Sequence, residues 1–328
     1  MSVLRVLLAV LAAVVPTSVY VLFVWWLDRY EKEPLRLLLA AFVWGAVPAV
    51  ALAATVEVAL QVPLDELFPR YGALLGISIV GPVIEEGLKA IALVAISILA
   101  RYEFDGLLDG VIYGSLVGFG FAMTENLLYF IGSDGATGEW LALILGRSVV
   151  FGLNHAMFAS FTGVGLSLAT GTRDRTQAVG IALLGIALAT GAHQVHNTFV
   201  SMGELCLIGV IVDWSGVAVI GAVILLAWRR EQLWLKRYLE EEVSAGVLSD
   251  EQYAIIRSWH ARVLDQVRAL AAGDVSGQRR RHDFFQAATE LAFKKHQASL
   301  WRYSGAASRV EELRKTVQRL GMDLSAGS

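Results

Sequence analysis

The sequence has 328 residues, of which 56% are hydrophobic and 17% are charged. The apolar residues occur in blocks of about 20 or more, which excludes a soluble globular domain and indicates transmembrane helices. The short alternating segments of a membrane barrel are absent from the sequence. The single cysteine, Cys206, excludes an intrachain disulfide and a thiolate metal cluster, so any metal must be held by Glu, His, Asp or Asn.

The charge is divided unevenly along the chain. Residues 1–228 hold 10 Lys and Arg against 17 Asp and Glu, whereas residues 229–328 hold 17 against 13. We therefore expect a transmembrane core at 1–228 and a basic, helical, cytoplasmic tail at 229–328. A basic face beside a membrane is typical of attraction to anionic lipid. The sequence shows no nucleic-acid recognition motif, so we expect the lipid bilayer as a partner and no nucleic acid.

The apolar blocks predict an all-α fold, a polytopic bundle of about seven transmembrane helices. The spans are expected at residues 4–27, 35–60, 72–100, 107–131, 140–170, 177–200 and 204–228. In the segments between and beside them, ten Lys and Arg fall on one side of the membrane and two on the other. The positive-inside rule then predicts a multi-pass protein of the cytoplasmic membrane, with its N-terminus outside and its tail in the cytoplasm.

Glycine recurs at positions 106, 110, 114 and 118 of the fourth span, an i,i+4 stripe on one helix face. Small residues at this spacing let two helix backbones approach closely. The stripe therefore predicts tight packing against a neighbouring helix, which fixes where Glu125 points.

The tail has the pattern of amphipathic helices. Ser249 and Gln252 have the spacing of a capping box and predict a helix that begins there and runs to about Leu270. We expect no catalytic residue in the tail.

Ionisable and amide side chains lie deep in four spans, where an ionised group costs roughly 2.5–3.5 kcal/mol. Such groups face the bundle interior or a water-filled cavity, so a set of them predicts a functional site. The set is Glu85, Glu86 and Lys89 in the third span, Glu125 and Asn126 in the fourth, His155 in the fifth, and His193 and Asn197 in the sixth. The lone Glu57 and Asp213 are interpreted as structural helix–helix groups.

These residue types suit the activation of water. A carboxylate can act as general base, a histidine can transfer a proton or bind a metal, and asparagine can stabilise an oxyanion. Two histidines and a glutamate can hold zinc, and Glu125, His155 and His193 are the candidate ligands. Buried Glu and His side chains also relay protons, so a proton-coupled transporter or channel is an alternative, as is a non-enzymatic membrane scaffold.

The polar residues form four motifs in a fixed order. They are Glu85-Glu86-x-x-Lys89, Phe121-x-x-x-Glu125-Asn126, His155 with Phe158, and His193-x-x-x-Asn197. In this order the motifs resemble those of the PrsW family of intramembrane proteases, over about residues 30–200. That family is similar to type II CAAX prenyl proteases and bacteriocin-immunity-type membrane proteases, whose first motif ends in Arg and second in His. Lys89 and Glu125 occupy those places here, which favours the PrsW branch.

The resemblance implies an intramembrane endopeptidase that cleaves a membrane-anchored protein, such as an anti-sigma factor, in regulated proteolysis and signalling. The implied catalytic set is Glu85, Glu86, Glu125, His155, His193 and Asn197, with Lys89 and Asn126 in support. The first motif would activate water, with Glu85 as base and Glu86 assisting. The second and third motifs would transfer protons or bind a metal, and the last motif would stabilise the oxyanion. The cofactor would be Zn²⁺, or none in a glutamic mechanism.

Overall fold

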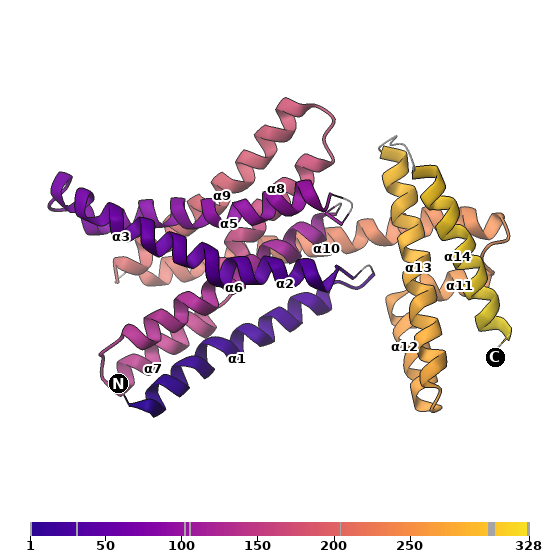
Figure 1. The fold of residues 1–328 in the computed structure, drawn as a ribbon, viewed down its shortest axis with the longest axis horizontal. Helices are drawn as coiled ribbons and strands as arrows, with labels where there is room; N and C mark the ends of the chain where they lie inside the picture. The colour runs from indigo at the N-terminus through magenta and orange to yellow at the C-terminus, as the bar shows by residue number, and fades with distance from the viewer. Residues whose placement is uncertain are drawn as a thin grey trace. The chain divides into compact units, whose positions relative to one another are not determined.

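The computed structural model describes residues 2–30, 32–101, 103–104, 106–203, 205–300 and 306–326. Within these residues every regular element is helical, which confirms the predicted all-α fold (Figure 1). The described helices that are long and apolar enough to cross a membrane are six: Val3–Leu27, Leu35–Leu67, Leu107–Gly132, Thr137–Thr170, Arg175–Ser201 and Cys206–Ser244. The expected span at 72–100 is also helical from Gly72 to Leu99, but three charged residues lie in it, so the predicted number of seven is approximate.

The chain forms two compact units. The membrane unit comprises Met1–Leu27 and Glu33–Leu225, and the tail unit comprises Asp28–Lys32 and Leu226–Ser328. Helix α10 (Cys206–Ser244) contributes to both. The roles expected for a core at 1–228 and a tail at 229–328 stay predictions.

Helices of the membrane unit are interrupted at three places by short π-helical segments. In chain order the elements are α1 (Val3–Leu27), α2 (Leu35–Trp44), η1 (Gly45–Ala49), α3 (Val50–Leu67), α4 (Gly72–Leu75), η2 (Gly76–Val80), α5 (Gly81–Leu99), α6 (Leu107–Gly132), α7 (Thr137–Leu145), η3 (Gly146–Val150), α8 (Asn154–Thr170) and α9 (Arg175–Ser201). Such wide turns are rare in proteins as a whole. Where they do occur, they are frequently found at functional sites.

Helix α6 lies at the centre of the membrane unit and packs against α1, α2 and α8 (Figure 1). It is buried on all sides for most of its length, as expected of a helix that is apolar all round. A Cβ atom placed on Gly110, Gly114 or Gly118 would overlap a backbone carbonyl oxygen of α8. The predicted close packing is therefore confirmed for these three glycines, whereas Gly106 is the N-cap residue of α6.

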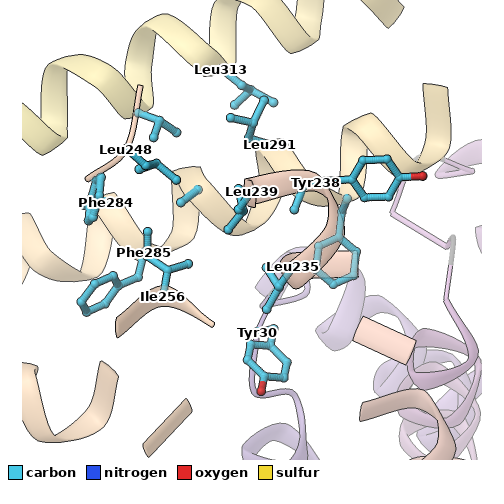
Figure 2. Packing of buried hydrophobic residues seen from close by; sticks show 14 residues of the cluster. Tyr30, Leu235, Tyr238, Leu239, Leu248, Ile256, Phe284, Phe285, Leu291 and Leu313 are labelled. Atoms are coloured by element: carbon cyan, nitrogen blue, oxygen red, sulfur yellow. The ribbon is translucent and has the colours of Figure 1, made fainter. Parts of the chain in front are cut away.

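The tail unit has its own hydrophobic core (Figure 2). After α10 come α11 (Asp250–Ile256), α12 (Trp259–Ala271), α13 (Val275–Leu300) and α14 (Ala306–Ala326). The core includes Tyr30, Leu235, Tyr238, Leu239, Leu248, Ile256, Phe284, Phe285, Leu291 and Leu313. Tyr30 precedes α2 in sequence, so the segment after α1 is built into this core.

The capping box predicted in the tail is confirmed, but the helix predicted to follow it is wrong. Ser249 Oγ accepts from the backbone N–H of Gln252 at 3.1 Å, and Gln252 Oε1 accepts from that of Ser249 at 3.0 Å. The helix does not continue to Leu270, because α11 ends and Ser258 caps a new helix by accepting from Ala261 N–H at 3.3 Å. A serine side chain competes for backbone hydrogen bonds and thereby favours a helix start.

Gly118→Ala tests the close approach of α6 and α8. The added methyl group would meet the carbonyl oxygen of His155, and overpacking of this kind costs about 1–3 kcal/mol. We expect a lower melting temperature of the detergent-solubilised protein, measured by tryptophan fluorescence. Gly132→Ala, at the open end of the same helix, is the control because its Cβ would meet nothing within 4 Å. Equal melting temperatures for the two variants would contradict the packing.

The tail unit also holds a buried carboxylate. Glu242 is 1% exposed and accepts hydrogen bonds from Lys295 Nζ at 2.7 Å, from Arg314 Nε at 2.7 Å and from Arg314 Nη2 at 2.9 Å. Burial alone would raise the pKa of the Glu242 carboxyl, but the hydrogen bonds from Arg314 and Lys295 hold this pKa below its usual value.

Glu242→Gln therefore has a pH-dependent effect. Because the folded-state pKa of Glu242 lies below the unfolded value of about 4.3, its contribution is complete above that pH and is lost as the pH falls through the folded pKa. We expect a loss of about 2 kcal/mol at neutral pH that shrinks in acid, measured by thermal denaturation of the full chain. The exposed Glu240→Gln is the control. A Glu242→Gln deficit that stays constant into strong acid would contradict this assignment.

Candidate active site

Three charged side chains of α5 converge because they are one helical turn apart. The ammonium Nζ of Lys89 lies 2.7 Å from Glu86 Oε1 and 3.4 Å from Glu85 Oε2. It also lies 4.0 Å from the centre of the Phe121 ring, which faces it from α6. Lys89 and Glu86 are fully buried. A buried ion pair of this kind is tolerated only when both charges have good partners, so Lys89 is the cation that lets the two glutamates lie inside the bundle.

The same ammonium group reaches His155 in the first turn of α8. Lys89 Nζ is 3.0 Å from His155 Nδ1, and His155 Nε2 is 3.0 Å from Glu125 Oε2. Because an ammonium only donates, Nδ1 accepts, and in the neutral ring the proton is then on Nε2 and donated to Glu125. His155 thus links the Glu–Glu–Lys group of α5 to the carboxylate of α6, and both of its ring nitrogens are engaged.

Glu125 and Asn126 are held by an arginine from the π-helical segment η3. Arg147 donates through Nη2 to Glu125 Oε2 and through Nε to Asn126 Oδ1 at 2.7 Å. Its guanidinium carbon lies 3.8 Å from the centre of the Tyr129 ring. The rigid fork of a guanidinium group can hold two acceptors at once, so Arg147 fixes both neighbours on α6.

Helix α9 supplies His193 and Asn197. His193 Nδ1 is 2.9 Å from Glu86 Oε1, and its ring stacks on Phe158 at 4.7 Å. Since a carboxylate only accepts, Nδ1 carries the proton and Nε2 of the neutral ring is an acceptor. Asn197 Nδ2 donates to the carbonyl oxygen of Ile77 at 2.9 Å, a residue of η2 immediately before α5.

A cavity of about 540 Å³ opens beside these groups. Its lining includes Glu57, Glu85, Glu125, Asn126, Arg147, His155, His193, His196 and Asn197. Glu86 and Lys89 are not among these lining residues. The structure thus brings all eight predicted site residues into one region, but it places some of them at the cavity and others in the packed interior. Glu85 borders the cavity, whereas Glu86 and Lys89 lie in the packed interior.

One cluster could hold a metal ion. Glu85, Glu86, His155 and His193 each offer a ligand atom, and these atoms all lie within 4.8 Å of one another. The ligand set expected from the sequence differs from this one, since it contained Glu125 and neither of the α5 glutamates. The physical reason is that the guanidinium group of Arg147 pairs with the Glu125 carboxylate.

Sequence reasoning missed Arg147. It treated the span at 140–170 as apolar, although Arg147 is the only Lys or Arg in that range, and a lone arginine at such a position is itself a signal. The two partners of Asp213, Asn154 and His196, were also not predicted. Asp213 Oδ2 accepts from Asn154 Nδ2 at 2.9 Å and lies 2.7 Å from His196 Nδ1, which joins α8, α9 and α10. The helix–helix hydrogen-bonding role expected for Asp213 is thereby confirmed.

Comparison with known proteins identifies relatives of the membrane unit. Residues 33–229 match the family described as PrsW family intramembrane metalloprotease. The chain is 31% identical over 160 residues to Protease PrsW of Clostridioides difficile (strain 630), covering 48% of this chain and 64% of that protein. It is 29% identical over 150 residues to Protease PrsW of Bacillus subtilis (strain 168), covering 46% and 63%.

The match to Protease PrsW of Shouchella clausii (strain KSM-K16) is longer, at 30% identity over 200 residues, 58% of this chain and 83% of that protein. The chain spans less than two thirds of the length of the first two relatives. No solved structure matches it significantly.

Arg147→Ala tests the link between η3 and α6. Breaking a buried ion pair costs about 3–5 kcal/mol, and partial exposure of this pair lowers the expected loss to about 1–3 kcal/mol. We expect a lower melting temperature for Arg147→Ala and Glu125→Gln, and a double variant less destabilised than the sum of the two. The exposed Arg173→Ala is the control. Additive losses in the double variant would show that the two side chains do not interact.

Proposed function

Because the chain belongs to the PrsW family of intramembrane metalloproteases, we propose that it is an intramembrane endopeptidase. The reaction is hydrolysis of a peptide bond in a membrane-anchored protein. The matched region, 33–229, contains every residue of the candidate site.

The observation that carries this proposal is the unequal environment of two adjacent glutamates. Glu86 is held at 2.7 Å by Lys89 and at 2.9 Å by His193, and it is 0% exposed. Glu85 borders the cavity, and its ion pair with Lys89 is longer, at 3.4 Å. A general base must reach the proton that it removes, so Glu85 is the carboxylate suited to contact a water molecule and Glu86 is suited to fix the cation between them.

The proton steps follow from this placement. Glu85 removes a proton from water while the water oxygen attacks the peptide carbonyl carbon. Glu85 then returns that proton to the amide nitrogen as the carbon–nitrogen bond breaks. The products are a new carboxyl group and a new amino group, and the base is regenerated.

Donors to the oxyanion are drawn from the cavity lining. Asn197 uses one N–H on Ile77, and its amide carries a second; Arg147 supplies further N–H groups. His193 suits this role less well than the sequence motif implies, because its hydrogen bond to Glu86 leaves Nε2 as an acceptor in the neutral ring. We therefore assign the oxyanion contacts to Asn197 and Arg147.

A zinc ion is the proposed cofactor. Carboxylates and imidazoles are zinc ligands, and the cluster of four groups fits such an ion in type and proximity. His193 would hold it, since it borders the cavity and keeps an acceptor nitrogen, whereas both nitrogens of His155 are engaged and Glu85 serves as the base. When bound, zinc supplies a Lewis acid that polarises water or the peptide carbonyl. In the metal-free alternative, Glu85 acts on water directly.

The proposed substrate is a membrane-anchored protein, an anti-sigma factor being the case that the family resemblance favours. The setting proposed for it is the cytoplasmic membrane, with the N-terminus of this chain outside. The bias of ten Lys and Arg against two in the connecting segments supports this orientation.

Glu85→Gln is the direct test. Glutamine keeps the shape of the side chain but cannot take up a proton, so we expect cleavage to fall by at least about 10²-fold. Membranes from cells that produce the wild-type protein, Glu85→Gln or the exposed control Glu66→Gln would be compared by N-terminal labelling and mass spectrometry. New N-termini next to membrane spans should appear with the wild type and Glu66→Gln only.

The same variants separate the proposal from proton transport. Identical N-termini in all three membranes would contradict hydrolysis by Glu85. Proton flux into liposomes that depends on Glu85, together with no new N-termini, would favour a transporter. Equal melting temperatures of the purified proteins would exclude misfolding as the cause of any loss.

A further inference from the structure

The tail unit contains a cavity lined by cationic side chains, separate from the candidate active site. Its volume is about 510 Å³, and its lining includes Arg29, Arg229, Lys236 and Arg257. None of the lining residues that the structure describes is acidic. Four positive charges around one hollow repel one another, so the arrangement favours an anion that can lie between them.

Three segments of the chain bring these charges together, with Arg257 at the end of α11. Arg229 and Lys236 are seven residues apart on α10 and therefore share one face of the helix. Arg29 follows α1, and its guanidinium carbon lies 3.4 Å from the centre of the Trp228 ring and 4.9 Å from that of Trp259. Stacking on these rings limits the movement of Arg29, so at least one cation of the cavity is held in place.

The start of α12 forms another wall of the cavity. Ser258, Trp259 and His260 line it, and they are the N-cap and first two residues of this 13-residue helix. Ser258 Oγ accepts from the backbone N–H of Ala261 at 3.3 Å and so caps the start of this helix. The positive end of the helix dipole thus adds to the four cationic side chains, a combination that suits phosphate.

Two of the lining residues closely follow apolar segments in the sequence. Arg29 is two residues after Leu27, the end of apolar α1, and Arg229 directly follows Trp228 at the end of the apolar part of α10. Tryptophan and basic residues at such positions are typical of the membrane–water interface. Among phosphate-bearing molecules, anionic phospholipids are the ones concentrated there, and Lys or Arg near their surface gains about 1 kcal/mol each.

We propose that this cavity, lined by Arg29, Arg229, Lys236 and Arg257, binds the phosphate headgroup of an anionic phospholipid. The site lies in the tail unit and is independent of the proposed hydrolysis. It gives the basic tail a defined lipid contact in place of a diffuse attraction to the membrane.

The test uses the full chain in a non-ionic detergent and native mass spectrometry to count bound phosphatidylglycerol or phosphatidylcholine. The lining variant is Arg229→Ala/Lys236→Ala, and the matched control is Arg268→Ala/Arg319→Ala, which removes two exposed charges of the same unit outside the cavity. We expect the wild type and the control to bind phosphatidylglycerol in preference to phosphatidylcholine. The lining variant should bind it at least about tenfold more weakly.

Several outcomes would overturn the proposal. Equal binding of the two lipids, or equal losses in the two double variants, would show that the cavity does not select an anionic headgroup. If inorganic phosphate bound as tightly as the lipid and displaced it, the ligand of the cavity would be a soluble anion and not a lipid. An RNA oligonucleotide that binds with the same dependence on Arg229 and Lys236, without phosphatidylglycerol binding, would assign the surface to nucleic acid. Melting temperatures without lipid show whether the lining variant is folded.

Discussion

The buried ammonium group of Lys89 is the contact on which the membrane unit depends. It touches Glu86 at 2.7 Å, His155 at 3.0 Å and Glu85 at 3.4 Å, and so joins α5 to α8 in the interior of the bundle. Without it two adjacent carboxylates would face each other in an apolar setting, which is costly for any buried charge. Because Glu86 and His155 take the short contacts, Glu85 is the least restrained carboxylate and borders the cavity.

Close packing of helix backbones positions the side chains that contact Lys89. Gly118 lets α6 approach the carbonyl oxygen of His155, so the first turn of α8 is set against the helix that bears Glu125. The π-helical segments add the remaining polar contacts: η3 presents Arg147 to Glu125, and η2 presents the carbonyl oxygen of Ile77 to Asn197. The geometry of the site therefore depends on helix packing, because a shift of α8 would move the His155 side chain and the backbone contact with α6 together.

Sequence reasoning predicted the helical fold and the convergence of eight polar residues, because charged groups in apolar spans have few tolerable locations. It could not assign the partners of Glu125. Glu125 was expected to join a metal site, but the guanidinium of Arg147, 22 residues away in sequence, competes for it. In the tail, a regular amphipathic pattern concealed the helix start at Ser258, where a local hydrogen bond outweighs periodicity. When several side chains from distant parts of the chain can bind the same group, the spacing of residues in the sequence does not show which of them does.

In the proposed reaction, Glu85 delivers a water molecule to a peptide bond. Cleavage of a purified membrane-anchored substrate in water enriched in ¹⁸O, followed by mass spectrometry of the fragments, follows that water molecule. We expect one ¹⁸O atom in the new C-terminal carboxyl group with the wild-type protein, and at least about 10²-fold less labelled product with Glu85→Gln. Fragments without the label, or labelled fragments formed equally fast by Glu85→Gln, would contradict it.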